Sequence, residues 1–383
     1  MNNPLQDTAI RFSDERAMLL ESAAAFCRER SPSARVRSLI DSDTGFDAAV
    51  WTEIGQLGWL GIAVPEAWGG SGLGAGSVAT VAEPLGRHLL ATPFASTQLA
   101  IQGLLASGQP AWQDAWLPQL AQGMAATVAL FEDDGDWCLT HPAATATRHG
   151  ATVRLNGSKT LVTDAGVANL RLVTVQCEGA LALALLPCSA LPPGATQREV
   201  VSDESRRVYR LSLDGVQLPA DHLITGASAQ AAVAAIQRMG WLLAAAEAAG
   251  GIAGALDVTV DYLNTRSAFG RKIGSYQGLK HPCADILVGL ERARSLVAHA
   301  ATLMNDGAPD AATELALRMA KAEAGDSLML AGDRAVQFHG GFGFTWDCDA
   351  QLYLRRALWL QPWFGDAAHH RRRIADQLWP VAA

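Results

Sequence analysis

The stretch Gln337-Phe-His-Gly-Gly-Phe-Gly-Phe-Thr345 follows a long Ala- and Leu-rich segment and places glycines at 340, 341 and 343. Gly340 and Gly341 have no side chain, so their backbone can approach a phosphate closely. Gly343 permits a backbone conformation that other residues resist. A helical run that ends in such a turn is typical of a site for a phosphate-containing ligand.

A second stretch, Arg266-Ser-Ala-Phe-Gly270, and the nearby Gln277 supply the other groups that such a ligand needs. Arg266 carries a fixed charge for a pyrophosphate, and Phe269 offers an aromatic face. Gln277 has an amide that both donates and accepts hydrogen bonds. Together the two stretches predict a dinucleotide that is bound outside a Rossmann fold.

The order of patterns along the chain predicts the fold class. Before about residue 120, apolar residues recur at three- and four-residue spacing, as in amphipathic helices. Short apolar runs punctuated by Gly, Pro and Asn follow at 127–131, 151–155, 170–175, 182–186 and 207–213. Helical patterns return at 229–265, 278–305, 309–338 and 348–379. A doubly wound parallel sheet is excluded, because it needs alternating strands and helices.

We therefore expect an α+β multidomain chain. The predicted parts are an N-terminal α-helical bundle at 1–124, a small antiparallel, barrel-like β domain at 125–225, and a C-terminal four-helix bundle at 226–383. Asn156-Gly157 stands between two apolar runs and predicts a β-hairpin at that point.

Composition excludes several classes of protein. With 49% hydrophobic and 18% charged residues, the chain has the composition of a packed enzyme rather than of a disordered segment. A net charge of -8 gives no reason to expect nucleic acid or an anionic membrane as a partner. Six cysteines without CxxC spacing indicate neither a disulfide framework nor a zinc site, so we expect reduced thiols and no metal.

The N-terminus predicts the location. Residues 1–7, Met-Asn-Asn-Pro-Leu-Gln-Asp, lack a basic-then-apolar signal, and no uninterrupted apolar run reaches about 18 residues. We expect a cytoplasmic protein without an anchor.

The glycine string at 69–74, Gly-Gly-Ser-Gly-Leu-Gly, is similar to a nicotinamide fingerprint in composition only. Helices precede it, no βαβ unit follows it, and no acidic residue lies about 20 positions further on within such a unit. We interpret it as a structural turn.

In this order and spacing the motifs resemble those of the acyl-CoA dehydrogenase family of flavoenzymes, and the resemblance runs along almost the whole chain. Residues 57–74 are similar to the family's N-terminal turn, Asn156-Gly-Ser-Lys159 to its central hairpin, and residues 266–285 to its signature helix pair. The resemblance implies FAD as the cofactor and the same helical, β, helical layout that the periodicity predicts.

The resemblance also implies which residues hold FAD. The family motifs Arg-x-x-Phe-Gly, a following Gln, and Gln-x-x-Gly-Gly match six residues: Arg266, Phe269, Gln277, Gln337, Gly340 and Gly341. In the family these groups reach the adenosine and pyrophosphate of a flavin that a neighbouring subunit binds, which would make oligomerisation part of the site. Each motif alone also fits an ordinary helix end.

The flavin-ring end of the family pattern is less well matched. Lys159-Thr-Leu-Val-Thr163 aligns with a family strand that usually carries Trp where this chain has Leu161. Thr163 is retained, and we expect it to bond the flavin ring. The family loop Thr-Glu-Pro-Gly-Ala-Gly-Ser-Asp is replaced by residues 131–140, Phe-Glu-Asp-Asp-Gly-Asp-Trp-Cys-Leu-Thr.

Three positions are considered for the catalytic base. Many family members place a Glu where this chain has Phe364, which cannot remove a proton. Others place it near the position of Gly240, and Glu247 lies two turns, about 10 Å, along the same helix. A carboxylate buried there among small apolar residues would be a good base, although a structural Glu paired with a neighbouring arginine fits the sequence equally well. Asp366 is the third candidate.

The resemblance implies an acyl-CoA dehydrogenase that forms a trans-2-enoyl-CoA and passes electrons to an electron-transfer flavoprotein. Residues 355–373 are similar to bacterial members that act on steroid-derived or other bulky acyl-CoA thioesters, and we expect His369 and His370 there to lie at the surface or an interface. A homodimer or homotetramer is expected, or a heterotetramer with a paralogous subunit. The alternative function is a non-catalytic subunit of such a heteromer. Related flavin oxidases and monooxygenases share the fold.

Overall fold

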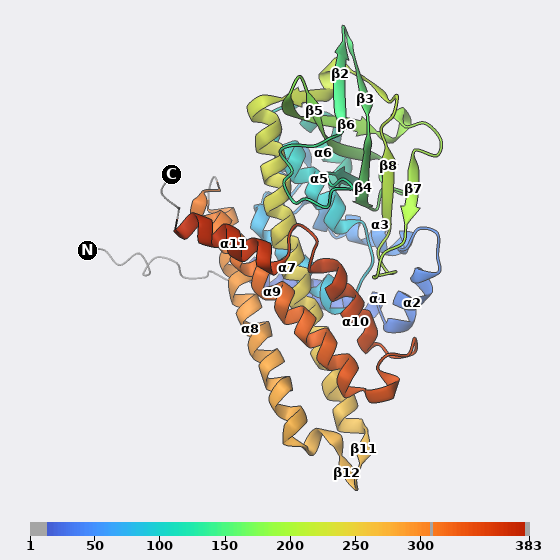
Figure 1. The fold of residues 1–383 in the computed structure, drawn as a ribbon, viewed down its shortest axis with the longest axis vertical. Coiled ribbons are helices and arrows are strands. Elements are labelled where there is room, and N and C mark those ends of the chain that lie inside the picture. The colour runs from blue at the N-terminus through green and yellow to red at the C-terminus, as the bar shows by residue number, and fades with distance from the viewer. Residues whose placement is uncertain (1–13, 307–308, 380–383) are drawn as a thin grey trace, which may run out of the picture. The chain divides into compact units, whose positions relative to one another are not determined.

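The computed structural model describes residues 14–306 and 309–379, so the N-terminal residues used to predict the location lie outside the described part. The chain forms two compact units (Figure 1). The first, here the helical unit, combines Met1–Pro32, Gly74–Leu90 and Trp241–Ala383. The second, here the mixed unit, combines Ser33–Leu73 and Ala91–Gly240. The predicted domain bounds 1–124, 125–225 and 226–383 stay a prediction.

The mixed unit contains four helices before its strands: α2 (Ser33–Ile40), α3 (Ala48–Gln56), α5 (Phe94–Ala106) and α6 (Pro110–Ala121). The strands are β1 (Ala126–Ala129), β2 (Thr145–His149), β3 (Thr152–Asn156), β4 (Ser158–Thr163), β5 (Leu170–Cys177), β6 (Ala180–Pro187), β7 (Thr196–Glu199), β8 (Val208–Ser212), β9 (Gln217–Pro219) and β10 (Leu223–Thr225). One sheet has the order β10-β6-β5-β2-β3-β9, with β1 also on β5, and a second has the order β4-β8-β7. Helices, then strands, then helices follow each other along the chain as predicted.

The pairing is antiparallel for most neighbours, and β1 and β2 both pair with β5 in parallel. This places β5 between β6 on one side and β1 and β2 on the other, which explains why all but one of its residues are buried. Buried side chains of both sheets meet in one core that includes Val153, Val173, Val175 and Leu211.

The hairpin predicted at Asn156-Gly157 is wrong. β3 pairs with β2 and β9, whereas β4 pairs with β8 in the other sheet, so Gly157 is the point where the chain changes sheets. Gly157 has φ 108°, and its N–H donates to Asp214 Oδ1 at 2.9 Å. The bond between Gly157 and the distant Asp214 outweighs the local preference of Asn-Gly for a hairpin turn. In the mixed unit, two-residue hairpins lie instead at 150–151 and 178–179.

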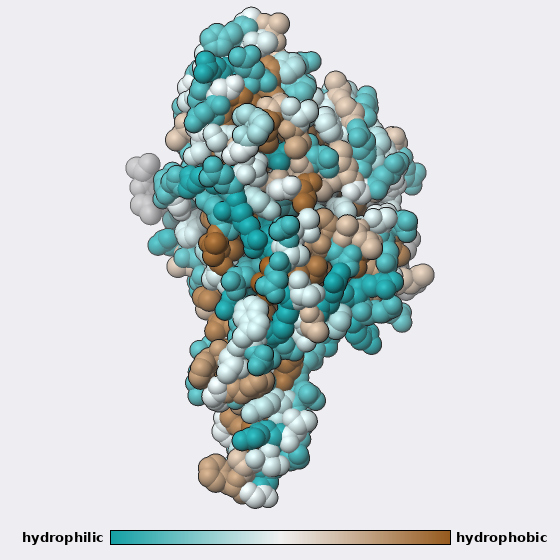
Figure 2. Space-filling model, turned by 90° about the vertical axis from the view of Figure 1, so that its right-hand side faces the viewer, coloured by the Kyte–Doolittle hydropathy of each residue, from teal (hydrophilic) through white to brown (hydrophobic). Residues whose placement is uncertain are grey.

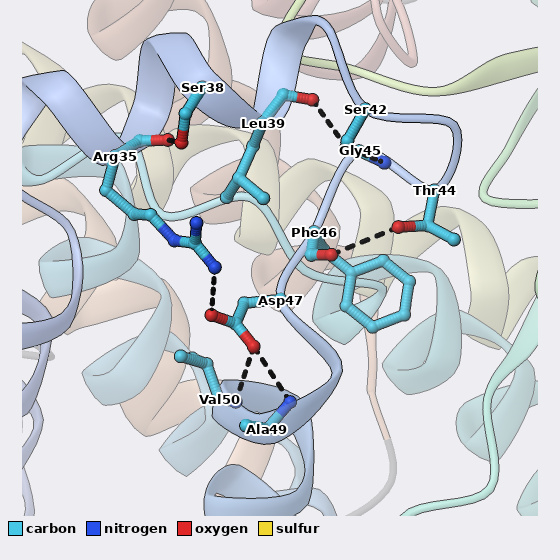
Figure 3. A network of polar contacts seen from close by, with 10 residues as sticks. All are labelled: Arg35, Ser38, Leu39, Ser42, Thr44, Gly45, Phe46, Asp47, Ala49 and Val50. Atoms are coloured by element: carbon cyan, nitrogen blue, oxygen red, sulfur yellow. Dashed lines mark hydrogen bonds and ion pairs between the residues drawn. The ribbon is translucent and has the colours of Figure 1, made fainter.

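Helix α3 begins at a side-chain cap that Figure 3 shows. Asp47 Oδ1 accepts from Ala49 N at 2.9 Å and from Val50 N at 3.5 Å, and the carboxylate also pairs with Arg35 of α2. The pair with Arg35 is the main cause that lowers the pKa of Asp47. The capped turn fixes the connection between α2 and α3.

The helical unit is built from α1 (Asp14–Arg30), α4 (Ala79–Arg87), the C-terminal part of α7 (Gly226–Thr265), α8 (Gln277–Asn305), α9 (Ala311–Phe338), α10 (Ala350–Leu360) and α11 (Ala367–Leu378). Glycines let α4 and α7 touch backbone to backbone. A Cβ added to Gly86 would lie 2.0 Å from Glu247 O, and one added to Gly250 would lie 1.8 Å from Glu83 O. This contact fixes the position of Glu247.

Two further observations refine the predicted helices. The segment 348–379 forms two helices, α10 and α11, because Pro362 and the left-handed residues Phe364 (φ 59°) and Gly365 (φ 104°) interrupt it. Helix α7 is long and apolar enough to cross a membrane, but 94% of its most apolar 18-residue window is buried inside the protein. We interpret α7 as a core helix.

Apolar side chains also reach the surface among polar ones (Figure 2). In the helical unit the most exposed are Phe269 at 95%, Phe344 at 77% and Trp379 at 72%. Phe269 lies at the tip of the short hairpin of β11 (Ser267–Ala268) and β12 (Arg271–Lys272).

Candidate active site

The two sequence motifs meet in the helical unit. Arg266, which follows α7, and Gly340 and Gly341, which follow α9, line one cleft of about 500 Å³. Phe269 lies on the connection between α7 and α8, Gln277 is the first residue of α8, and Gln337 lies in the last turn of α9. These three residues are exposed and are not among the residues that line the cleft. The structure thus brings three of the six predicted dinucleotide contacts together.

The glycines of the turn have different roles. Gly340 has φ 61°, and a Cβ on Gly343 would lie 2.1 Å from Val336 O, so the fold itself requires both. A Cβ on Gly341 would meet no atom within 4 Å, although Gly341 lines the cleft. Packing does not explain this glycine, whereas close approach of a ligand does. The open backbone beside the Arg266 charge therefore fits the pyrophosphate of FAD.

Tyr262 and His339 are among the cleft residues that sequence reasoning missed. The His339 ring stacks on Tyr262 with 4.2 Å between ring centroids, and its Nδ1 donates to Ala335 O at 2.7 Å. His339 is buried, so the stack fixes the residue that precedes Gly340. The positions of both residues could have indicated that they line the cleft, because Tyr262 lies one helical turn before Arg266 and His339 lies inside the glycine motif.

Thr163 lies in the mixed unit, at the end of β4. Its carbonyl accepts from Thr127 Oγ1 at 2.6 Å, and it pairs with Val208 of β8. Within the described residues no hydrogen bond involves the Thr163 hydroxyl, so the hydroxyl is available to a ligand. The predicted contact to the flavin ring stays a prediction.

Just before Thr163, β4 contains an irregularity that a carboxylate holds in place. Leu161, where the family usually has Trp, has φ 53° and is 39% exposed. Glu199 of β7 accepts from Leu161 N at 3.0 Å and from Thr160 Oγ1 at 2.9 Å. Arg210 in turn lies 3.4 Å from Glu199. A non-glycine residue in this conformation is strained, and Glu199 offsets the strain.

The replaced loop at 131–140 is anchored through Glu132. This carboxylate accepts from Ala144 N at 2.9 Å and from Lys159 Nζ at 2.6 Å, and Lys159 has no exposed side-chain surface. Burial lowers the pKa of Lys159, and the ion pair with Glu132 opposes that change. The loop thus keeps a fixed connection to β4 without the family sequence.

Glu247 is buried as predicted, at 6% exposure, but it is paired. Its Oε1 bonds Arg356 Nη1 of α10, and the Arg356 side chain has no exposed surface. This is the arrangement that the structural alternative predicted. The carboxylate is thus already engaged by the guanidinium of Arg356. The role of Glu247 as a base stays a prediction.

The segment where many family members carry the base is rigid and contains no free carboxylate. Phe364 is 2% exposed, and its carbonyl accepts from Trp241 Nε1 at 3.0 Å and from His370 Nε2 at 3.1 Å. Asp366, the third candidate, caps α11 through His369 N at 2.7 Å. A capping carboxylate is already committed to backbone N–H groups.

Buried basic groups hold this segment. Lys321 Nζ donates to the carbonyls of Leu360, Gln361 and Gly365 at 3.0, 3.1 and 3.0 Å. Burial lowers the pKa of Lys321 to about 7. His370 was expected at the surface or at an interface, but within the chain its side chain is fully buried, and burial next to Lys321 and Arg318 lowers its pKa to about 2. His370 is therefore a neutral structural residue.

Among the residues that the structure describes, no group of three or more His, Cys, Asp or Glu side chains could hold a metal ion. All six cysteines are free, and three of them are buried.

Two family models match the sequence. The model described as "Acyl-CoA dehydrogenase, N-terminal domain" matches residues 13–124, and the model described as "Acyl-CoA dehydrogenase, C-terminal domain" matches residues 230–379. The chain is also 31% identical to acyl-CoA dehydrogenase FadE12 of Mycobacterium tuberculosis, over 89% of this chain and 90% of that protein.

Solved structures give the same result. A steroid ACAD variant, Tcur3481-Tcur3483, is 28% identical with a TM-score of 0.83, over 95% of this chain and 97% of that chain. The ChsE4-ChsE5 complex from Mycobacterium tuberculosis is 25% identical with a TM-score of 0.87, over 98% of this chain and 100% of that chain.

Proposed function

Because the chain belongs to the acyl-CoA dehydrogenase family, we propose that it oxidises the CoA thioester of a bulky acid, such as a steroid-derived acyl group, to the trans-2-enoyl thioester. Family members are FAD-dependent oxidoreductases, and this chain is one of them. Bound FAD supplies the acceptor for the hydride from the β-carbon. The chain itself has to hold the dinucleotide, place the thioester and remove the α-proton.

The observation that carries this function is the cleft formed by Arg266, Gly340 and Gly341. A glycine that packing does not require lies there beside a fixed positive charge, which suits a pyrophosphate. The test is the absorption spectrum of the protein purified alone. We expect a flavin band near about 450 nm that an acyl-CoA substrate bleaches without oxygen. A colourless protein that takes up no added FAD would contradict the function.

The bulky acyl group is supported by the 28% identical steroid ACAD and by the similarity of residues 355–373 to such enzymes. A panel of steroid-derived and straight-chain acyl-CoA thioesters tests it. We expect bleaching by the steroid-derived thioester at a higher kcat/KM than by the straight-chain ones, and the reverse order would refute the substrate class.

We further propose Glu247 as the base, because it is a buried carboxylate on the helix that leads into Arg266. To act, it has to be reached by the α-carbon while Arg356 holds its orientation. A second candidate function, a non-catalytic subunit that contributes to FAD binding and assembly, is favoured by one observation: Phe364 occupies the usual base position and Glu247 is already paired. Flavin that is bound but bleached only after a paralogous subunit is added would establish this second function.

We propose an electron-transfer flavoprotein as the electron acceptor and the cytoplasm as the location. An oligomer is supported by the exposure of Phe269 and Phe344 near the dinucleotide motifs, since large exposed apolar side chains mark interfaces. The complex of ChsE4 with ChsE5 supports a heteromer, and we propose a heterotetramer with a paralogous subunit as the alternative to a homodimer or homotetramer. Light scattering on the chain alone and co-expressed with a paralogue distinguishes the assemblies.

A further inference from the structure

A second cleft lies in the helical unit, where residues of α1, α4, α7 and α8 form its wall. It shares no lining residue with the cleft at Arg266, and neither Glu247 nor Asp366 lines it. Its volume is about 530 Å³. Small-molecule sites in proteins have volumes of about 300–1,000 Å³. The second cleft is thus large enough for a small organic ligand, and the proposed reaction does not use it.

One part of the wall is apolar. Leu20 and Ala24 of α1 both line the cleft, and they lie on one face of the helix because they are four residues apart. Pro84 of α4 lines it as well. This part of the wall suits the hydrocarbon body of a ligand.

The other part of the wall is charged, and two of its arginines are already balanced. Arg87 Nη2 lies 2.7 Å from Asp257 Oδ2, and Arg294 Nη2 lies 2.8 Å from Glu83 Oε1. All four residues line the cleft. Each of these two guanidinium groups therefore has one carboxylate as its counter-charge.

Arg28 of α1 is the third arginine of the cleft, and it has no counter-charge. Within residues 14–306 and 309–379 no hydrogen bond or ion pair involves the Arg28 side chain, and the same holds for hydrogen bonds of the His88 ring. Burial, and then the charges of Arg87 and Arg28, lower the pKa of His88, so its imidazole is neutral at pH 7 and keeps one N–H donor. One positive charge and one donor are left in the cleft.

We propose that this cleft binds a small organic monocarboxylate. Its carboxylate pairs with Arg28 and accepts from the His88 ring, and its hydrocarbon body packs against the apolar part of the wall. A guanidinium matches a carboxylate with two parallel hydrogen bonds. One negative charge balances the cleft, whereas a phosphate dianion would leave it with excess negative charge beside the two carboxylates already present. Arg28 is exposed, so the ligand can enter from solvent.

The test is calorimetric titration of the full-length protein with octanoate at pH 7, with octanamide as the uncharged analogue of the same length. We expect Arg28→Met to weaken octanoate binding at least about 10-fold, the effect of losing a charge-assisted contact. Arg28→Lys keeps the charge and should retain part of the affinity. Arg30→Met is the matched control, because Arg30 lies on the same helix, pairs with Glu29 at 3.4 Å and does not line the cleft. It should leave the affinity unchanged.

Three results would overturn the proposal. Unchanged octanoate affinity in a folded Arg28→Met variant would place the binding elsewhere, including any binding where the acyl group of the substrate lies. Octanamide that binds as tightly as octanoate would show that the cleft does not recognise a charge. Inorganic phosphate that binds the Arg28-dependent site more tightly than octanoate would refute the ligand class.

A second variant decides if Arg28→Met does not fold. Ala24→Phe fills the apolar part of the cleft and should also weaken octanoate binding, and full affinity in that variant would contradict the proposed position of the hydrocarbon body. The titration requires neither flavin reduction nor acyl-CoA. Its failure is therefore distinguishable from failure of the proposed function, which is read from the flavin band.

Discussion

The pair of Glu247 and Arg356 allows a test that separates a structural carboxylate from a catalytic one. Both side chains are buried, at 8% and 0% exposure, so removing one charge takes from the other its ion-pair partner in the protein interior. Such a change costs about 3–5 kcal/mol in the free energy of unfolding. Glu247→Gln should therefore destabilise the protein by about this amount, measured by urea unfolding at pH 7.

The same helix offers a matched control. Asp257 of α7 pairs with Arg87 at 2.7 Å, but these side chains are 55% and 42% exposed. Exposed pairs contribute about 0–1 kcal/mol, so Asp257→Asn should be nearly neutral. Replacing both Glu247 and Arg356 by Met should recover much of the stability that Glu247→Gln loses, because a buried pair can be exchanged for apolar residues of similar volume.

The kinetic measurement on the same variant tests the base. If Glu247 removes the α-proton, Glu247→Gln with FAD bound should reduce its flavin at least about 100-fold more slowly in anaerobic stopped flow. A variant that is less stable but reduces flavin at the normal rate would make Glu247 structural only. A variant as stable as Asp257→Asn would refute the argument from the buried pair itself.

Four further substitutions test other parts of the structure. The Arg266→Ala and Gln337→Ala variants should each lose bound FAD during gel filtration, because a charge-assisted contact contributes about 1.5–3 kcal/mol to binding. Full flavin occupancy in both variants would show that the predicted FAD site is wrong. The pKa of His370 is lowered from 6.5 to about 2, so the unfolded chain binds a proton that the folded chain does not, and stability should fall as pH drops from about 6.5. His370→Gln should show a weaker fall in urea unfolding between pH 7 and 4, and an unchanged slope would contradict a neutral buried imidazole. Glu199→Ala should weaken FAD binding through the Leu161 irregularity, measured by flavin fluorescence, whereas an unchanged affinity would separate this part of β4 from the flavin.

The layout of the fold could be predicted because each element carries its own periodicity. The short run at 170–175, Leu-Arg-Leu-Val-Thr-Val, belongs to β5, which neighbouring strands flank on both sides. The hairpin at Asn156-Gly157 failed for the opposite reason. The bond from Gly157 to Asp214 joins residues 57 positions apart, and no local pattern announces it.

The same distinction applies to the candidate site. The cleft at Arg266 and Gly340 could be predicted, because its glycines and its arginine lie in short sequence motifs at helix ends. The partner of Glu247 could not, because Arg356 lies 109 positions away and its sequence neighbours fit a solvated helix face equally well. The sequence left two roles for Glu247, catalytic base and structural partner of an arginine, as equal alternatives. The contact between Glu247 and Arg356 is seen only in the structure.

Several hydrogen bonds from buried side chains hold the segment around Phe364 in place. Lys321, Trp241 and His370 all donate to its backbone carbonyls, and none of these bonds depends on the side chain at position 364. The frame that presents the base in many family members is therefore intact, while the carboxylate itself is replaced by Phe. Backbone-directed bonds preserve the position whichever residue occupies it, so Phe364→Glu should be accommodated at the cost of burying a charge. If that variant gains flavin reduction with acyl-CoA and the wild-type protein has none, the frame is competent and the chain alone lacks only its base. If the variant folds, binds FAD and still does not reduce it, the missing function lies elsewhere in the site.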